Sequence, residues 1–358
     1  MKVVHVIEAL GGGVYTYFKD LSYFMGQEEI TKDVKTYVIY SAKRKEIIPE
    51  NISKDFSSNI TMIPLEMERE LSPIKDLNAA FKLTKIFKEI NPDVIHLHSS
   101  KAGVIGRWAK FMTFKNIKVF YTPHGYSFLR QDISDNKKLI YKKIEKYTQA
   151  IFGGKTIACG DTEYEIAKEL GKATLVRNGI NFQKIALNYN PQTTKKLTFG
   201  IVGRITPQKN PKLFNEIAMQ FPQYNFIWIG NGELNHEITA PNIKITGWFY
   251  STSEVYEWLN QIDVFLQTSL WEGLPLAVLE AMALKKPIIA TNVIGNKDIV
   301  QNNVNGFLFD EINELKPIFK NLENDSFRNK LGEGAFLDAQ ENFDMNKNFM
   351  KLLDIYKS

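Results

Sequence analysis

The sequence has a single cysteine, Cys159, among its 358 residues. One cysteine cannot form an internal disulfide or a multi-cysteine metal site. No apolar run approaches the ~18 to 20 residues that a membrane-spanning helix needs. The short apolar run from Val3 to Ile7 is followed by three glycines, so it predicts a first strand and not a signal peptide. These absences together favour a cytoplasmic protein.

Two common ligand-binding signatures are also missing. Gly11-Gly12-Gly13 lies between the expected first strand and first helix, but Thr16 stands where the dinucleotide fingerprint needs a third glycine. A nicotinamide oxidoreductase is therefore disfavoured. The sequence contains no Asp-x-Asp, so a carboxylate pair that holds a divalent cation on a nucleotide diphosphate is not indicated.

The charge is only mildly unbalanced. A formal net charge of +5 and a pI of about 8.9 are compatible with phosphate-rich ligands or an anionic membrane surface. The excess is too weak to indicate nucleic acid as a partner.

Short apolar runs alternate with longer amphipathic stretches along most of the chain, which is the pattern of parallel βαβ units. The pattern lapses in the polar segment before Leu197, which carries Pro191 and predicts a linker. We expect an α/β protein with two Rossmann-like domains, residues 1–183 and 197–340, joined by a linker over 184–196. Residues 341–358 should form a helix that packs back toward the N-terminal domain. Two such domains would leave a deep cleft between them, where ligands commonly bind.

Two carboxylates, Glu272 and Glu280, follow the strand-like run from Ile262 to Leu266. Pro275 suits the first turn of a helix, so Glu272 should lie in a strand-to-helix turn and Glu280 about two turns into the helix. Both could then face a crevice at the carboxyl end of a parallel sheet. Taken alone, such a pair is more often a helix cap and a solvated surface charge.

Two loops have the composition of phosphate-binding segments. Arg204 and Lys209 lie in the loop before an expected helix, where Arg binds phosphate in a forked way and Lys binds it as a point charge. The alternative is an exposed basic loop. The three glycines at 11–13 either let backbone N–H groups approach a phosphate or form a tight turn.

Three histidines lie on or just after expected strands. His124 follows the strand from Lys118 to Thr122, where a turn residue with a satisfied ring is common. His96 and His98 alternate on one strand and should share a face. A metal site needs a third ligand, and the sequence nominates none, so no metal is predicted.

Over nearly its whole length the chain resembles the family 4 glycosyltransferases, which are retaining enzymes of the GT-B fold. The strongest match is the Glu-x7-Glu motif at Glu272 and Glu280 in its setting Ser269 to Pro275. Further stretches match in family order: His124-Gly125, Asn178-Gly179-Ile180, Gly203-Arg204 with Lys209, Ala290 to Gly295, and Asn305 to Leu308. The segments Glu70 to Pro73 and His96 to Gly103 resemble, more narrowly, bacterial transferases of capsule, O-antigen and exopolysaccharide assembly.

The resemblance implies a nucleotide-sugar donor, most commonly a uridine nucleotide, a glycan or polyprenyl-diphosphate-linked acceptor, and no cofactor or metal. Glu272 and His124 would contact the transferred sugar, Arg204 and Lys209 would neutralise the leaving diphosphate, and Glu280 would bind the ribose. A leaving phosphate oxygen would deprotonate the acceptor hydroxyl on the same face of the sugar. The implied donor-binding set also includes Gly12, Gly13, Gly203, Gly230, Asn231, Gly232, Gly247, Trp248, Gly273, Leu274 and Pro275. The acceptor-side residues would be Arg69, Ser99, Ser100 and Lys101.

The sequence departs from the family pattern at three positions. Asp298 stands where a Glu is frequent, Asn210 where a Gly is frequent, and Asn181 where an Asp is frequent. The Asp side chain is one methylene group shorter than the Glu that would contact the sugar or phosphate. Neither asparagine removes a catalytic group.

Residues 137–147 carry five lysines against one glutamate. Ile140, Ile144 and Tyr147 would share one helical face, so this basic helix could lie on an anionic membrane. An ordinary surface helix with its apolar face in the core is the alternative. The basic-aromatic stretch from Arg107 to Lys115 supports peripheral attachment to the cytoplasmic face of the membrane.

Two other functions stay open at this level. A sugar-nucleotide epimerase shares the expected architecture and would interconvert sugar nucleotides without an acceptor. A non-catalytic nucleotide-sugar-binding protein would bind without turnover.

Overall fold

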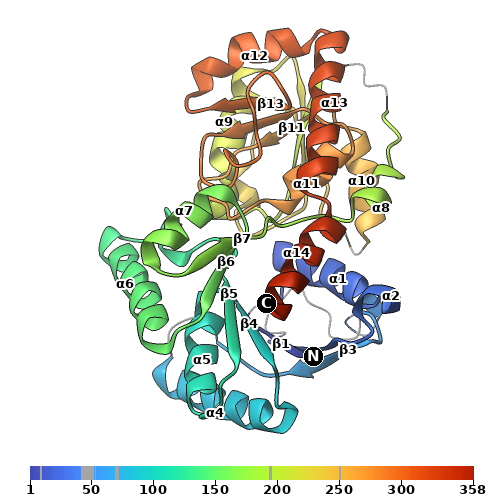
Figure 1. Ribbon diagram of the computed structural model, residues 1–358. Coiled ribbons are helices and arrows are strands. Elements are labelled where there is room, and N and C mark those ends of the chain that lie inside the picture. Colours follow the sequence, from blue (N-terminus) through green and yellow to red (C-terminus); the bar gives the residue numbers. More distant parts are fainter. Residues whose placement is uncertain (9, 42–51, 53, 69–71, 193–195, 250) are drawn as a thin grey trace. The chain divides into compact units, whose positions relative to one another are not determined.

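The computed structural model describes residues 1–8, 10–41, 52, 54–68, 72–192, 196–249 and 251–358 (Figure 1). The chain forms two compact units. The N-terminal unit comprises Met1–Leu129, Ile133–Asn178 and Met345–Ser358, and the C-terminal unit comprises Arg130–Asp132 and Gly179–Asp344. The last helix is therefore part of the first unit.

The N-terminal unit contains a seven-stranded parallel sheet in the order β3-β2-β1-β4-β5-β6-β7. The two central strands, β1 and β4, are buried almost throughout because helices cover both faces. The strands are β1 (Lys2–Ile7), β2 (Lys35–Tyr40), β3 (Ile60–Pro64), β4 (Val94–His98), β5 (Lys118–Thr122), β6 (Lys155–Ala158) and β7 (Ala173–Leu175).

The helices of this unit divide between the two faces of the sheet. Val4, Val6 and their neighbours share a core with α4 and α5, whereas the opposite face, which carries His5 and His96, meets α1 and α14. The elements are α1 (Gly13–Met25), α2 (Glu28–Thr31), α4 (Pro73–Ile90), α5 (Ser100–Phe111), η1 (Ser127–Leu129), α6 (Asp135–Phe152), α7 (Asp161–Leu170) and α14 (Met345–Lys357).

The C-terminal unit contains a six-stranded parallel sheet in the order β10-β9-β8-β11-β12-β13. Its core is aromatic, with Phe199, Phe214 and Trp228 fully buried. The strands are β8 (Thr198–Val202), β9 (Asn225–Ile229), β10 (Ile243–Ile245), β11 (Val264–Gln267), β12 (Ile288–Thr291) and β13 (Gly306–Phe309). The helices are α8 (Phe182–Ala186), α9 (Pro211–Gln220), α10 (Thr252–Asn260), α11 (Leu276–Ala283), α12 (Leu315–Leu322) and α13 (Asp325–Asn342), with short 3-10 turns η2 (Pro207–Lys209), η3 (Asn235–Glu237) and η4 (Ile312–Glu314).

The prediction of two parallel α/β sheets is confirmed. The sequence did not predict the short strands β3, β7 and β13, nor the helices α12 and α13. Helix α8 occupies the first part of the range expected to be a linker, because the Asn181 side chain accepts a hydrogen bond from Lys184 N and caps it.

In each sheet the strand order reverses between two central strands. The reversal lies between β1 and β4 in the N-terminal unit and between β8 and β11 in the C-terminal unit. Open α/β sheets bind ligands outside the carboxyl ends of their strands at such a point. The loops that follow these four strands are therefore where functional residues are expected.

Candidate active site

Glu272 lies in the turn between β11 and α11 and is buried. Its Oε1 atom accepts hydrogen bonds from Lys209 Nζ at 2.8 Å, Ser269 Oγ at 2.6 Å and Gln267 Nε2 at 3.0 Å. Its Oε2 atom accepts one from Gln208 Nε2 at 3.1 Å. The carboxylate thus has four side-chain donors, one of which is a cation, and this excludes the alternative of a simple exposed cap.

The loop after β8 and the loop after β11 are bound to one another. Leu270 N donates to Gln208 O at 2.8 Å, Gln208 Nε2 donates to Trp271 O at 3.1 Å, and Thr268 Oγ1 donates to Lys209 O at 2.8 Å. Because β8 and β11 are neighbours, their loops meet at the point where the strand order reverses. The structure therefore brings Lys209 and Glu272 together as predicted residues of one site. Arg204 lies half-buried in the same loop as Lys209.

Gly295 fixes the position of the Glu272 turn. Its φ is +85°, and a Cβ atom at this position would lie 2.5 Å from Gly273 O and 2.7 Å from Glu272 Cβ. Only glycine allows the turn after β12 to approach so closely. Thr291 Oγ1 also donates to Ser269 O at 2.6 Å. The stretch from Ala290 to Gly295 thus packs against the turn that carries Glu272 and fixes the position of its backbone.

Three of the glycines assigned to donor binding allow a close approach of loops. A Cβ atom at Gly230 would lie 2.3 Å from Gly203 O, and one at Gly232 would lie 2.3 Å from Ile205 O. At Gly247, which has a φ of +88°, a Cβ atom would meet no described atom within 4 Å. Its neighbour Trp248 is half exposed. Gly203, Gly230 and Gly232 are therefore explained by packing, whereas the space beside Gly247 is open.

Glu280 is the fifth residue of α11 and is buried. It lies little more than one turn into the helix, so the prediction that Glu280 lies about two turns in is wrong. The reason is that Gly273 and Leu274 lie outside the helix, which begins after Pro275.

Two of the departures from the family pattern have a structural explanation. Asn210 has a φ of +51° and caps α9 by accepting from Leu213 N at 3.4 Å. Glycine and asparagine both tolerate this left-handed backbone. Asn181 caps α8 as an aspartate would.

In the N-terminal unit, Gly12 and Gly13 begin α1 at the carboxyl end of β1. Gly12 has a φ of +57°, and a Cβ atom on either glycine would meet no described atom within 4 Å. No side chain caps the helix and its first turn has no acidic residue. These glycines leave free space before a helix N-terminus, which is a suitable place for an anion.

His124 lies in the turn after β5 with a φ of +52°. Its Nε2 atom is 3.0 Å from His98 Nδ1, and burial lowers the pKa of His124 to about 4. The next residue, Gly125, donates its N–H to Glu163 Oε1 at 2.8 Å. Glu163 is fully buried and also accepts from Cys159 N at 2.7 Å. The sequence did not single out Glu163, because a Glu in the first turn of a helix is ordinary.

The residues predicted on the acceptor side have different surroundings. Ser99 Oγ is buried and has no hydrogen-bonding partner among the described residues, and Ser100 Oγ accepts from Ser127 Oγ at 3.0 Å. Lys101 Nζ pairs with Asp76 Oδ2 at 2.6 Å and its side chain is buried, so it ties α5 to α4. Arg69 lies outside the described residues.

The structure supplies the third histidine that the sequence did not nominate. His5 on β1 is opposite His96 on β4, and each of His5, His96 and His98 has a ring nitrogen within 4.8 Å of the other two. Both nitrogens of His96 and both of His98 already make hydrogen bonds. An ion would have to replace those bonds. His5 was missed because it stands 93 positions from His98 in the sequence.

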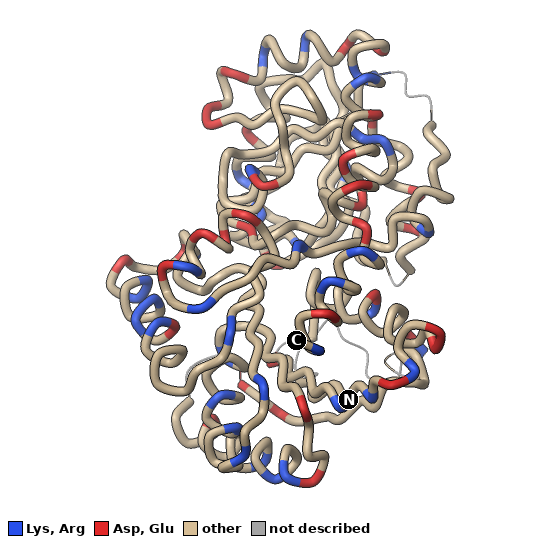
Figure 2. Tube along the Cα trace, in the orientation of Figure 1, with Lys and Arg blue, Asp and Glu red and all other residues tan. Residues whose placement is uncertain are grey.

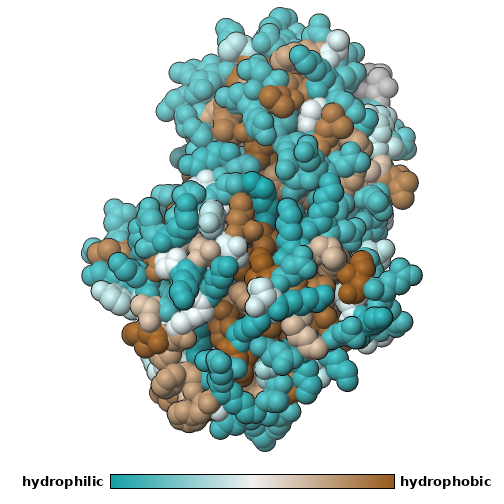
Figure 3. Space-filling model, in the orientation of Figure 1, coloured by the Kyte–Doolittle hydropathy of each residue, from teal (hydrophilic) through white to brown (hydrophobic). Residues whose placement is uncertain are grey.

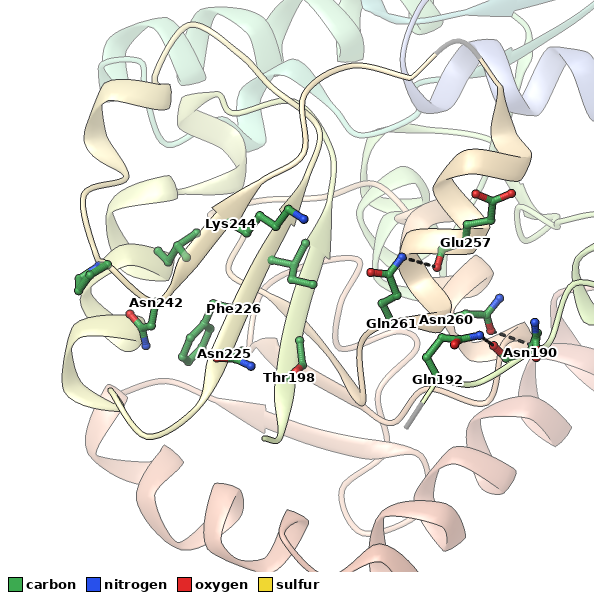
Figure 4. Close-up of a pocket in the computed structure, with 13 residues that line it drawn as sticks. Asn190, Gln192, Thr198, Asn225, Phe226, Asn242, Lys244, Glu257, Asn260 and Gln261 are labelled. Atoms are coloured by element: carbon green, nitrogen blue, oxygen red, sulfur yellow. Dashed lines mark hydrogen bonds between the residues drawn. The ribbon is translucent and has the colours of Figure 1, made fainter. Parts of the chain in front are cut away.

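A pocket of about 740 Å³ lies elsewhere in the C-terminal unit (Figure 4). Its lining includes Thr198, Asn225 and Ile243, the first residues of β8, β9 and β10, together with the end of α10. It is therefore at the amino edge of the sheet, opposite the loops that hold Glu272. None of the predicted site residues that the structure describes lines it.

Sequence reasoning also missed three of the four donors to Glu272. Gln267 and Ser269 flank Thr268 at the carboxyl end of a buried strand, and Gln208 immediately precedes Lys209. A polar run at the carboxyl end of a buried strand is a signal that could have found the first two.

Comparison with known proteins gives two family matches that adjoin at residue 184. Residues 12–184 match the model described as Glycosyltransferase Family 4, and residues 184–337 match the model described as Glycosyl transferases group 1. The two models together span the Gly12 turn, His124, Lys209, Glu272 and Glu280.

Individual relatives cover most of the chain. The UDP-Gal:alpha-D-GlcNAc-diphosphoundecaprenol alpha-1,3-galactosyltransferase of Escherichia coli is 31% identical over 320 residues, which are 80% of this chain and 81% of the relative. The capsular polysaccharide biosynthesis glycosyltransferase CapM of Staphylococcus aureus is 25% identical over 96% of this chain and 95% of its own.

Solved structures resemble the whole chain. Sucrose-phosphate synthase of Thermosynechococcus elongatus matches with a TM-score of 0.81 and 16% identity, over 100% of this chain and 98% of that one. HepE of Anabaena in complex with UDP-glucose matches with a TM-score of 0.78 and 18% identity, over 100% and 99%. These likenesses confirm the predicted GT-B fold.

Proposed function

We propose that this chain, which belongs to the family 4 and group 1 glycosyltransferases, moves a sugar from a uridine diphosphate sugar to a polyprenyl-diphosphate-linked glycan. The names of the relatives support the substrate classes, since the E. coli relative is named for UDP-Gal and a diphosphoundecaprenol acceptor. Relatives named for capsule and O-antigen synthesis support a place in bacterial surface polysaccharide assembly. The pairing of Glu272 with Lys209 is the observation that supports the chemistry.

Lys209 and Arg204 would stabilise the leaving diphosphate. Negative charge grows on the bridging phosphate oxygen as its bond to the anomeric carbon breaks, and cations already in position are the usual means of stabilising it. Glu272 holds Lys209 Nζ at 2.8 Å and so keeps the cation in place before the donor arrives. Two basic side chains can supply this charge without a metal ion.

The proposed reaction retains the anomeric configuration. The bond from the anomeric carbon to phosphate breaks, and the bond to the acceptor oxygen forms on the same face of the sugar. The leaving phosphate oxygen takes the proton of the acceptor hydroxyl. The Glu272 carboxylate is held by four donors, which disfavours its acting as a nucleophile.

A transfer assay tests this proposal. The full chain would be incubated with UDP-galactose, UDP-N-acetylglucosamine or UDP-glucose and with a polyprenyl-diphosphate-linked N-acetylglucosamine, with and without EDTA. We expect one donor to yield an EDTA-insensitive product whose new linkage keeps the donor's α configuration by NMR. An inverted linkage would contradict retention, and loss of turnover in EDTA would contradict metal independence. Conversion of the sugar nucleotide without acceptor would identify an epimerase instead.

We also infer that the N-terminal unit attaches to an anionic membrane through α6. This helix buries Glu145, Thr148 and Gln149. Four of its apolar side chains, Leu139, Ile140, Tyr147 and Ile151, are 52% to 69% exposed, whereas Tyr141 and Ile144 are partly buried. An ordinary amphipathic helix with its apolar face in the core does not explain the four exposed side chains.

The neighbouring helix and loop extend the same surface. Trp108 and Phe111 of α5 and Phe114 after it are 43%, 57% and 87% exposed, and α5 packs against both α4 and α6. Basic residues recur along α6, as its blue segments show (Figure 2), and brown and tan groups lie among teal ones over this part of the unit (Figure 3). Apolar side chains ringed by lysines fit the interface of an anionic bilayer. No helix within the described ranges is long and apolar enough to span a bilayer.

A further inference from the structure

A row of three histidine rings runs from the turn after β5 to the middle of β1. His124 Nε2 lies 3.0 Å from His98 Nδ1, and His98 Nε2 lies 3.0 Å from His5 Nδ1. His5 and His98 are fully buried, and both pack against the ring of Phe18. The Tyr17 ring of α1 packs against His124 in a T-shaped arrangement and against His98 in a tilted one. Each nitrogen of His98 therefore faces another histidine.

The tautomers of the three rings depend on one another. Burial lowers the pKa of His5 to about 3 and that of His124 to about 4, and burial with His96 nearby holds the pKa of His98 well below 6.5. Each ring is therefore neutral at pH 7, with one N–H group and one acceptor nitrogen. Two neighbouring nitrogens cannot both donate or both accept, so the N–H groups all point along the row toward His124 or all toward His5.

The inner end of the row determines this direction. His5 Nε2 is buried, and no described atom lies within hydrogen-bonding distance of it. If the N–H groups pointed inward, this nitrogen would carry a buried N–H without an acceptor. If the N–H groups point outward, His5 Nε2 carries a buried lone pair that accepts no hydrogen bond from a described residue. Buried N–H groups without a partner are the rarer case in proteins, so the outward direction is favoured.

We propose that His5 and His98 are positioning residues that hold His124 as its Nδ1–H tautomer. In the outward direction His5 Nδ1–H donates to His98, and His98 Nδ1–H donates to His124 Nε2. The proton of His124 is then on Nδ1, which makes no hydrogen bond to another described residue. His124 thus offers a neutral N–H donor to a ligand oxygen. That this oxygen belongs to the sugar or phosphate of a nucleotide sugar rests on the proposed function; the tautomer does not.

His96 provides a reference of the opposite kind in the same unit. Thr122 Oγ1 donates to Ile157 O at 2.9 Å, so it must accept from His96 Nε2 at 2.8 Å. His96 is therefore an Nε2–H tautomer whose Nδ1 accepts from the Tyr356 hydroxyl.

NMR of the full chain labelled with 15N-histidine tests the proposal, because the chain has only five histidines. Long-range proton–nitrogen spectra at pH 7 should show Nδ1–H tautomers for His5, His98 and His124 and an Nε2–H tautomer for His96. Single substitutions would assign the signals. An Nε2–H tautomer at His124 would overturn the proposal. Zinc bound one-to-one in the purified protein would also overturn it, because the ion would occupy the same nitrogens.

Two substitutions at position 98 test the positioning role. His98→Asn keeps an N–H group near the place of Nδ1, whereas His98→Leu removes it. We expect His124 to stay an Nδ1–H tautomer in the first variant and to become a mixture in the second. Transferase kcat should fall roughly tenfold in His98→Leu and recover in His98→Asn, the effect of about one hydrogen bond.

The exposed His236 serves as the control, since His236→Gln should change neither spectrum nor rate. If His98→Leu does not fold, His5→Leu removes the inner end of the row and should also give a tautomer mixture at His124. An unchanged His124 tautomer in a folded variant at position 98 or 5 would refute the positioning role. The spectra need no substrate, so a failure of the proposed function is distinguishable from a failure of this proposal.

Discussion

The Glu272 carboxylate combines burial, a cation and three neutral donors in one turn. A buried carboxylate next to a partly buried lysine is stable only when the remaining lone pairs have donors, and Gln208, Gln267 and Ser269 supply them. The arrangement fixes Lys209 Nζ in the loop after β8. At the residue scale, Glu272 therefore contributes to the proposed reaction partly by holding Lys209 in position.

Replacing this charge should separate catalysis from folding. Glu272→Gln keeps the size and one acceptor oxygen but no longer holds Lys209 by charge. We expect kcat to fall roughly 10²- to 10³-fold, as when a pre-positioned charge contact is lost, with little change in melting temperature. Glu272→Ala should in addition lower the melting temperature, because it leaves the partly buried Lys209 without its carboxylate partner. Steady-state kinetics and calorimetry of both variants measure the two effects, and full turnover by Glu272→Gln would refute the assignment.

Gly295→Ala should displace the same glutamate without touching its chemistry. The added methyl group would lie 2.5 Å from Gly273 O and 2.7 Å from Glu272 Cβ, and the φ of +85° adds strain of about 1–3 kcal/mol. We expect a lower melting temperature together with at least a tenfold loss of kcat. Gly153→Ala is the matched control, because its φ is +75° but a Cβ atom there meets nothing within 4 Å. It should lower the melting temperature and leave kcat unchanged; equal losses of kcat in both variants would contradict the placement of Gly295.

The site residues differ in whether they could be predicted from the sequence alone. Lys209 and Glu272 could be predicted because each lies in the loop between a strand and a helix and belongs to a motif. The polar run from Gln267 to Ser269 at the carboxyl end of a buried strand marks a candidate site, but its side chains could not be assigned as donors to Glu272, since uncharged residues carry no motif of their own. His5 could not be found at all, because its neighbours on the pleated face come from β4, more than 90 positions later.

At the scale of single elements, α6 shows where periodicity alone is ambiguous. Its apolar residues recur at helical spacing, which fits a face on a membrane and a face in the core alike. In the structure Ile140 and Tyr147 are exposed, because the buried side of the helix is polar: Glu145 accepts from the Tyr121 hydroxyl at 2.8 Å and Gln149 Nε2 donates to Lys172 O at 2.8 Å. These partners lie on β5 and just before β7 and cannot be deduced from the helix sequence. Long periodic helices such as α4 were predictable, whereas short strands such as β7 were not, because three residues carry too little pattern.

Vesicle flotation tests the membrane role of α6. The triple variant Leu139→Ser, Ile140→Ser, Ile151→Ser changes side chains that are 52% to 69% exposed, so each change should cost little stability. We expect the unaltered chain to float with phosphatidylglycerol vesicles at low salt and to be released by 1 M salt. The triple variant should bind roughly tenfold more weakly or worse, because three apolar side chains no longer enter the interface.

The control for flotation is Leu187→Ser, which changes an 88% exposed leucine in the C-terminal unit. It should float as well as the unaltered chain. Equal binding by the triple variant would refute the proposed attachment surface, and equal binding to uncharged vesicles would remove the role of the lysines.

At the scale of the whole molecule, the chain completes its first unit with its last helix. Tyr356 of α14 donates its hydroxyl to His96 on β4, across 260 positions of sequence, and Phe349 packs on Phe24 and Tyr17 of α1. The apolar spacing of this helix was visible in the sequence. The buried polar contacts it makes were not, because they depend on which sheet face the helix covers.

Those buried histidines should make the N-terminal unit sensitive to acid. In the unfolded chain each histidine binds a proton near pH 6.5, whereas burial lowers the pKa of His5 to about 3 and that of His124 to about 4 in the folded state. Between these values the unfolded state binds more protons, so stability rises with pH and is lost as the pH falls below 6.5. We expect the free energy of unfolding to fall by about 1 kcal/mol for each of these two histidines between pH 7 and pH 5.5.

Urea midpoints, followed by hydrogen exchange of β1 and β4 peptides, measure this slope of stability against pH. His5→Gln should reduce that slope, whereas His236→Gln, which changes an exposed histidine of the C-terminal unit, should leave it unchanged. If hydrogen exchange of the β4 peptide showed no change in stability between pH 7 and pH 5.5, the histidines would bind protons in the folded state as readily as in the unfolded state. That result would contradict the row of neutral, hydrogen-bonded rings.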